Sequence, residues 1–399
     1  MLRIFFPAAL CSLLIAIAGT EARGQALRLQ QVLDSALQFH PALRAAQLNA
    51  RQRQELLPTA TALPDPVLNL ESPTGNFYTL GVTQSFDLPA VYRRQKALSQ
   101  TQLERANAET TVAGQELKYR VALAFTDWQY RHAVLSRLAA QDSAVQATAT
   151  AAERLFQQGQ TDALPAQFAA LQAAASRTRL HQAEQGLLLA WENLRSLAGL
   201  QVPGVPEPFD ERLLTPAGAG SAGIAGIAGT PAGRLGELGI AVAERERALI
   251  QSRRWPRLSL GYLNQGERNS PWQNRFNVGL SMPLWQKQYS ASAQAAQTGV
   301  EIERQRVAAR SVEWEAALRR AQGEAAQHRR ALAEYAQAVL PAARRLNETA
   351  GRLYESGLSD LSACLRYRND ALDAELAYCG LQRDAQVSAL TLLLLNGRL

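Results

Sequence analysis

The sequence predicts a mainly α-helical fold with two β-hairpins, built from two copies of one unit of long antiparallel helices. The 399 residues are rich in Ala, Leu, Gln, Arg and Glu, and only 7% are aromatic, which is typical of long helices. The alternating segment 80–89 returns as 278–285, and the segment 154–162 returns as 352–360, each about 198 residues later. A strand motif and a turn motif therefore keep the same spacing in both halves, which indicates that a rigid element of fixed length separates them.

Residues 1–24 are expected to form a signal peptide. Arg3 provides a basic start, Ile4–Ile17 is apolar, and Ala16-Ile17-Ala18 resembles a cleavage motif. An apolar stretch of this length is too short to span a bilayer, and no later stretch reaches the ~18 apolar residues of a membrane helix. The mature chain is therefore expected to have no transmembrane helix.

The first repeat is expected to span residues 25–205. It opens with a helix from about Leu27 to Leu57, which Pro41 should break or kink. A β-hairpin over 66–88 follows. It consists of the strand Pro66–Glu71, the turn residues Pro73–Asn76 and the returning strand Phe77–Leu88.

A long helical hairpin over 89–200 completes the first repeat. Between Pro89 and Gln158 the only helix breaker is Gly114, so this segment should form one rod of about 105 Å. Gly159 then reverses the chain, and the returning helix is expected over Pro165–Leu200.

The second repeat is expected over 230–399, after a Gly/Ala-rich linker over 206–229 at the equator of the molecule. It should contain a helix from Thr230 to Arg254, a β-hairpin over 256–285 and a helical hairpin over 286–397. Its long rod contains four potential breakers, which are Gly299, Gly323, Pro341 and Gly351.

The returning helices are only about half as long as the rods that they follow, so each should be extended by a second, stacked piece. We expect the helix 230–254 to extend the first returning helix, and the N-terminal helix to extend the last one. Each half then has one continuous rod and one rod made of two pieces.

The four strands of one chain cannot close a membrane barrel, because the smallest such barrels need eight. The strand 77–88 places Tyr78, Leu80, Val82 and Phe86 on one face, with Gln84 interrupting it, and small polar residues on the other. Since a lipid-exposed sheet must be closed, three copies supplying twelve strands would solve the problem. The alternative is a pair of soluble hairpins packed on the helices.

The mature chain resembles the TolC-type outer-membrane efflux proteins, the outer-membrane factors. The resemblance rests on the duplicated strand–helix–turn–helix, on His40-Pro41-Ala42-Leu43, and on the Gly159 and Gly357 turns, each followed by Thr/Ser-Asp. It implies a homotrimer with a twelve-stranded β-barrel in the outer membrane above a periplasmic tunnel of helices. The segment 86–95 is nearest to the heavy-metal branch, CusC/CzcC.

The turns between the long helices contain the candidate functional residues. Asp162 and Asp360 are expected to cap the helices that follow, and in a trimer they would also form acidic rings around one narrow mouth. Their candidate partners in this gate are Arg154, Arg352 and Tyr354. The candidate residues for docking an adaptor at the tips are Gly159, Thr161, Gly357 and Ser359.

Other functional classes find little support in the residues. The four histidines are scattered, without a partner at helical spacing, so no metal site is expected. The glycine pattern at 218–223 follows no strand, so no dinucleotide or other cofactor is expected. Charges of both signs alternate despite the net charge of +7, so nucleic acid is not an expected partner. No constellation of catalytic side chains appears, and the chain is not expected to be an enzyme.

The leading hypothesis is a passive exit duct for heavy-metal cations or drugs, which the resemblance couples to a periplasmic adaptor, the membrane fusion protein, and an inner-membrane RND-type pump. Two alternatives stay open. One is a periplasmic coiled-coil adaptor or scaffold without a pore, and the other is the exit duct of a type I secretion system.

Overall fold

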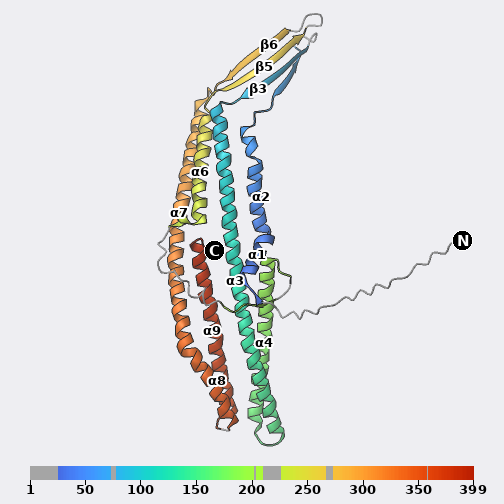
Figure 1. The fold of residues 1–399 in the computed structure, drawn as a ribbon, viewed down its shortest axis with the longest axis vertical. Coiled ribbons are helices and arrows are strands. Elements are labelled where there is room, and N and C mark those ends of the chain that lie inside the picture. The colour runs from blue at the N-terminus through green and yellow to red at the C-terminus, as the bar shows by residue number, and fades with distance from the viewer. Residues whose placement is uncertain (1–25, 73–77, 202–203, 210–225, 267–272, 357) are drawn as a thin grey trace, which may run out of the picture.

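The computed structural model describes residues 26–72, 78–201, 204–209, 226–266, 273–356 and 358–399. The signal peptide predicted over 1–24 and the turn at Gly357 lie outside these ranges. The molecule is long and narrow, with a β-sheet at one end, helices along its length and two helical tips at the other end (Figure 1). This is the mainly α-helical, duplicated architecture that the sequence predicts.

The first half begins with a short strand and two helices before its β-hairpin. Its elements are β1 (Ala26–Leu27), α1 (Leu29–Phe39), α2 (Pro41–Glu55), the 3-10 helix η1 (Leu57–Thr61), β2 (Val67–Glu71), β3 (Tyr78–Phe86), α3 (Pro89–Gln157) and α4 (Ala163–Ala198). The uninterrupted 69-residue α3 confirms the first predicted rod.

The predicted break at Pro41 is confirmed. His40 adopts an extended conformation between α1 and α2, and its Nδ1 accepts a hydrogen bond of 3.2 Å from the Ala42 backbone N–H. Proline disfavours a helical conformation in the preceding residue but fits the first turn of a new helix. The N-terminal segment is therefore two helices.

The second half repeats the hairpins with one difference in its long rod. Its elements are β4 (Val205–Pro206), the 3-10 helix η2 (Ile227–Gly229), α6 (Pro231–Ser252), β5 (Arg257–Gly266), β6 (Gln273–Ser281), α7 (Gln286–Glu334), the π-helix η3 (Tyr335–Val339), α8 (Leu340–Glu355) and α9 (Leu361–Leu395).

The second rod is helical throughout but not regular. The wide π-turn η3 ends two residues before Pro341, and the rod changes direction there (Figure 1). Proline offers no N–H, and its ring collides with the carbonyl four residues earlier in a regular helix. A widened turn relieves this conflict. The counterpart rod, α3, contains no proline after its first residue and therefore needs no such turn.

The stacking of the two-piece rods is the reverse of the prediction. The α1 and α2 pair extends α4, and α6 extends α9 (Figure 1). The Ser35 hydroxyl donates a 2.7 Å hydrogen bond to the Ala198 carbonyl at the first junction. At the second junction, a Cβ on Gly397 would lie 2.8 Å from the Pro231 side chain.

The order of the strands explains this reversal. The four strands of the two β-hairpins form one antiparallel sheet in the order β2-β3-β5-β6, and the short strands β1 and β4 pair separately. Each strand is joined to one helix, so the helices below the sheet follow the same order, α2-α3-α6-α7. α9 packs between α3 and α7/α8, which places it below α6, while α4 packs on the other side of α3, below α2. Helix lengths alone allowed both pairings.

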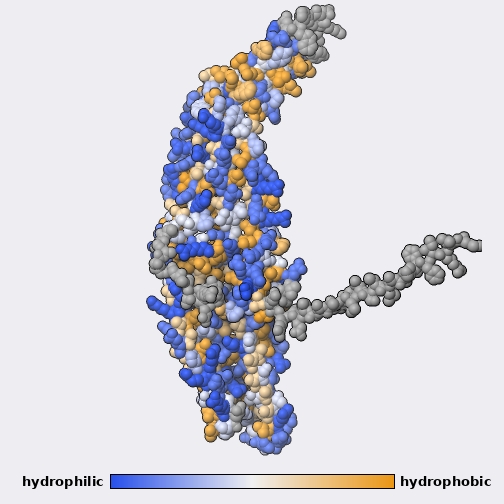
Figure 2. All heavy atoms as spheres, in the orientation of Figure 1, coloured by the Kyte–Doolittle hydropathy of each residue, from blue (hydrophilic) through white to orange (hydrophobic). Residues whose placement is uncertain are grey.

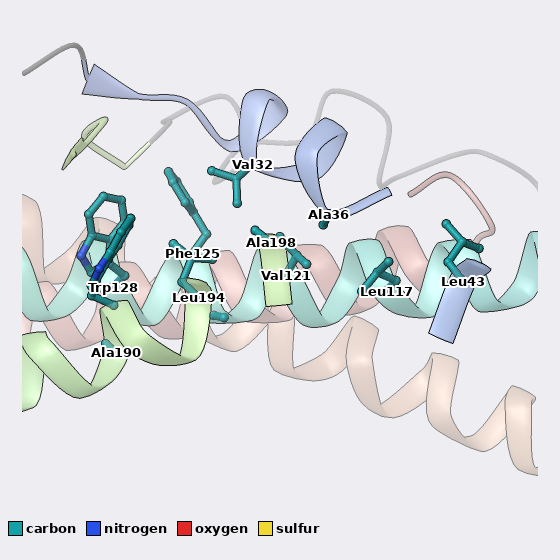
Figure 3. Close-up of a cluster of buried hydrophobic side chains, with 12 residues drawn as sticks. Val32, Ala36, Leu43, Leu117, Val121, Phe125, Trp128, Ala190, Leu194 and Ala198 are labelled. Carbon is teal, nitrogen blue, oxygen red and sulfur yellow. The ribbon is translucent and has the colours of Figure 1, made fainter. Parts of the chain in front are cut away.

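A buried cluster joins α1, α3 and α4 near the middle of the molecule (Figure 3). The Trp128 ring lies with its centroid 5.3 Å from Trp191 and 5.7 Å from Phe125. Val32 and Leu194 are fully buried beside these rings. Aromatic contacts of this kind add specific packing to the hydrophobic effect, so this cluster fixes the N-terminal helix to the junction of the first stacked rod.

Candidate functional site

The β-sheet has one apolar face and one polar face. Large side chains stand on the apolar face in successive cross-strand rows. They are Leu68, Leu70, Leu80, Val82, Phe86, Leu258, Leu260, Tyr262, Phe276, Val278 and Leu280. Phe276 is 82% exposed and Val278 is 69% exposed, and apolar side chains gather over the sheet in Figure 2. An exposed apolar surface of this extent indicates a membrane or protein partner.

The opposite face is mostly made of small and polar residues, with Val67 and Leu263 as its apolar exceptions. It includes Asn69, Gly81, Thr83, Ser85, Ser259, Gly261, Asn277 and Gly279. At Gly81 a Cβ would lie 2.6 Å from the Leu263 side chain, so glycine leaves room for the neighbouring strand. An apolar face backed by a polar face is the pattern of a strand between lipid and a water-filled lumen.

Gln84, the predicted interruption of the apolar face, satisfies its amide locally. Its Nε2 donates hydrogen bonds to the Pro64 carbonyl at 2.7 Å and to the Ser85 carbonyl at 3.0 Å. Because the amide donor is paired with backbone carbonyls, this residue costs the apolar face less than its polarity suggests.

The two outer strands, β2 and β6, are paired on one side only among the described residues. They run in opposite directions, since each neighbour in the four-stranded sheet is antiparallel. The β6 edge of one sheet is therefore suited to continue antiparallel pairing with the β2 edge of another.

At the far end of the molecule the first tip is a tight helix-ending turn. Gly159 has a φ of 69°, its N–H donates to the Phe156 carbonyl, and the Gln160 N–H donates to Leu155, both at 2.9 Å. This bonding pattern ends a helix through a left-handed residue, for which glycine is favoured. In the second tip the Leu358 N–H donates to the Leu353 carbonyl at 2.9 Å, the equivalent bond.

The two tip aspartates differ in the bonds that they make. The Asp360 carboxylate accepts a 2.7 Å bond from the Ala363 N–H and a 3.2 Å bond from the Ser362 hydroxyl. Asp162 also occupies the position before its helix, but its side chain makes no capping hydrogen bond. The predicted cap is therefore present in the second tip and absent in the first.

The predicted gate partners do not meet the aspartates within one chain. Arg352 pairs instead with Glu348 at 3.4 Å, and both side chains are exposed. Arg154 lies in a groove of about 660 Å³ between α3 and α4. Tyr354 packs against a buried cluster formed by Val145, Ala152, Ala169, Ala173, Leu361 and Leu365. Among the described residues, no ion pair joins Asp162 or Asp360 to Arg154 or Arg352, so such a pair would have to form between copies.

Apolar side chains at both tips are a feature that the sequence reasoning missed. They are Leu155, Phe156 and Leu164 in the first tip, and Leu353 and Leu358 in the second. Leu164 is 75% exposed and Leu358 is 77% exposed. The sequence did contain a signal for them, because leucine and phenylalanine stand beside exposed turns, where no hydrophobic core requires them. Of the residues predicted to dock an adaptor, Thr161 lies between Phe156 and Leu164 in sequence, and Ser359 directly follows Leu358.

Polar contacts also connect α3 to both returning helices. Arg177 on α4 approaches Asp142 at 3.5 Å, and Glu375 on α9 approaches Arg137 at 3.0 Å. Arg177 and Glu375 occupy equivalent positions of the duplication, 198 residues apart. Opposite charges at one duplicated position therefore bind to the same central helix.

The described part of the chain contains no group of three His, Cys, Asp or Glu side chains that could hold a metal ion. Across the same residues, no helix is both long and apolar enough to cross a membrane.

Comparisons with known proteins agree with this architecture. No protein-family model and no curated protein matches the chain. Solved structures do match it over most of its length. The outer-membrane channel OprN has a TM-score of 0.74 at 16% identity, covering 92% of this chain and 89% of its own. The CmeC outer-membrane channel of Campylobacter jejuni has a TM-score of 0.75 at 14% identity, covering 92% of this chain and 85% of its own.

A structure of CusC, described in terms of folding and transmembrane channel formation, matches with a TM-score of 0.73 at 15% identity, covering 94% of this chain and 93% of its own. The chain therefore has the fold of these channel proteins along nearly its full length.

Proposed function

We propose that this chain is an outer-membrane factor of the TolC type, located in the outer membrane with its helices in the periplasm. The observation that carries the proposal is the sheet at one end of the long rods, which exposes a large apolar face and, among the described residues, two edges that are paired on one side only. A soluble scaffold would cover such a face, whereas a sheet in a lipid bilayer must expose apolar side chains to the lipid. The shared fold with outer-membrane channels supports the same conclusion.

The functional unit is a homotrimer with a closed barrel of twelve strands. One sheet supplies four strands and leaves complementary antiparallel edges at β2 and β6. Closure removes every free edge from the lipid, as a membrane barrel requires. Head-to-tail contacts of one kind close into a ring under three-fold symmetry.

The outer helices support the same ring. The two lateral rods of one chain are α7/α8 and α2/α4, directly below β6 and β2. Each has exposed apolar side chains, including Ile302 and Val312 on α7 and Leu171 and Leu189 on α4. Contact between these rods of neighbouring copies would bury these side chains and close a tunnel of helices under the barrel.

The tips are the proposed entrance for substrates. Their exposed apolar residues and compact turns suit docking of a periplasmic adaptor helix, and the adaptor would connect the duct to an inner-membrane RND-type pump. Heavy-metal cations or drugs are the proposed cargo, in keeping with the similarity of the segment 86–95 to the CusC/CzcC branch. The duct itself needs no cofactor and catalyses no reaction, and a signal peptide over 1–24 would direct its export.

A pair of adjacent substitutions tests this proposal. Val278→Arg places a charge on the apolar face, and Asn277→Arg places the same charge on the polar face. A cation on the lipid side of a barrel costs about 2–4 kcal/mol near the membrane centre. We expect Val278→Arg to reduce SDS-resistant trimer in the outer-membrane fraction, and Asn277→Arg to preserve it.

The alternatives predict other outcomes. A periplasmic adaptor or scaffold would tolerate both changes and would not partition with the outer membrane, so that result would refute the proposal. Reconstituted protein should also conduct ions in a planar bilayer. Loss of protein secretion, with metal and drug export intact, in cells lacking the protein would favour the type I secretion alternative.

A further inference from the structure

Arginines from three helices converge in one groove of the second helical hairpin. The groove has a volume of about 460 Å³ and lies across α9, between α3 and α8. Arg137 of α3, Arg352 of α8 and Arg368 of α9 line it, together with Glu348 and Glu375. Ala371 and Leu372, which also line it, are buried.

The two carboxylates of the groove are already engaged. Glu375 pairs with Arg137 at 3.0 Å, and Glu348 pairs with Arg352 at 3.4 Å. Arg368 forms no ion pair among the described residues, and its Nε is buried without a hydrogen-bond acceptor. A buried donor without an acceptor is uncommon and calls for an explanation. Three guanidinium groups against two carboxylates leave the groove one positive charge in excess.

Gly351 allows Arg368 to occupy this position. A Cβ on this buried residue would lie 2.8 Å from Nη2 of Arg368. Glycine inside a helix is normally unfavourable relative to alanine, so its presence here needs a local reason. The duplication offers a comparison, because the positions 198 residues earlier hold Glu153 and Ala170 in place of Gly351 and Arg368. The helical hairpin therefore forms without this pair.

We propose that this groove binds a polyatomic oxyanion of the phosphate type, with Arg368 as its principal ligand. A guanidinium group presents several donors in a planar fork that matches two oxygens of such an anion. The anion would provide the missing acceptor for Arg368 and neutralise the excess charge. With Arg137 and Arg352 on the flanking helices, it would also link the second helical hairpin to α3. The site lies within one chain, so it does not depend on the channel assignment.

Isothermal titration of the detergent-solubilised full-length protein with inorganic phosphate, at constant ionic strength in chloride, tests the site. We expect saturable binding to the unmodified protein and at least tenfold weaker binding to Arg368→Gln. Arg366→Gln is the matched control, because Arg366 is an exposed arginine on the same helix outside the groove. It should bind phosphate as the unmodified protein does.

Gly351→Ala provides a second variant that should not impair folding, because alanine favours a helix. We expect it to weaken phosphate binding by displacing the Arg368 guanidinium, while the thermal transition stays unchanged or rises. Absence of saturable binding to the unmodified protein would overturn the proposal. So would equal losses in Arg366→Gln and Arg368→Gln, because they would indicate general attraction to a basic surface.

Discussion

The aspartates at the two tips show how duplicated residues acquire different roles. Asp360 caps α9 through the Ala363 N–H, whereas the Asp162 side chain makes no such bond. A lost N-cap costs about 0.5–2 kcal/mol, typically ~1. Asp360→Ala should therefore lower the thermal stability of its hairpin, and Asp162→Ala should lower it much less. Thermal unfolding of the two variants in parallel checks this, and equal losses would contradict it.

Charge at the tips can be tested separately from capping, because asparagine also caps helices. In the proposed trimer Asp162→Asn together with Asp360→Asn removes six carboxylates from the mouth. We expect a weaker cation preference in planar bilayers, because rings of carboxylates attract cations. We also expect a larger conductance, because exposed ion pairs between copies, which contribute only ~0–1 kcal/mol each, would act together to narrow one opening. Unchanged conductance and selectivity would leave Asp360 as a cap and Asp162 without a gating role.

Gly159 is the tip residue whose backbone most restricts substitution. Its φ of 69° costs a side-chain-bearing residue about 1 kcal/mol or more, and valine is among the least suited. Gly159→Val should destabilise the first tip and reduce chemical crosslinking to the proposed adaptor. Gln160→Val is the matched control, because Gln160 is the next residue in the same turn and does not have a positive φ. Equal crosslinking in both variants would exclude this tip as the docking site.

At the scale of single elements, the long helices were predictable and their junctions were not. The segment after Pro89 with no further proline and only Gly114 predicted α3, and the Gly159 turn predicted where α4 begins. The widened turn before Pro341 was not foreseen, because a proline signals a disturbance without showing whether the helix breaks or adapts. The tip leucines were missed because they follow no helical period.

The buried aromatic cluster is the element-scale feature with the clearest energetic consequence. Trp128 is 3% exposed and contacts Phe125 and Trp191. Truncation of a buried tryptophan to alanine costs about 3–5 kcal/mol. Trp128→Ala should lower the thermal transition markedly, whereas Phe39→Ala, which alters an exposed aromatic residue of α1, should lower it far less. Comparable losses would show that the cluster does not hold α1 in place.

For the whole molecule, assembly is the central expectation. Val312 is 67% exposed on a lateral rod, where the proposed trimer would bury it. Val312→Glu should therefore increase the fraction of monomer in mild detergent, measured by light scattering against an expected trimer of about 125 kDa by chain count. The neighbouring change Glu313→Gln should leave the trimer intact. If the unmodified protein is a monomer that still conducts ions, trimer closure is wrong.

The duplication, the rods, the turns and the four amphipathic strands could be predicted from the sequence, because each depends on local periodicity and on the backbone limits of proline and glycine. How these parts combine depends on contacts that form only in the folded chain. The tertiary structure joined β3 to β5, so that two hairpins became one sheet, and this strand order placed α2 above α4 and α6 above α9. It also brought Arg137, Arg352 and Arg368 into one groove. Contacts between residues hundreds of positions apart depend on which helices become neighbours, and neither periodicity nor length specifies that.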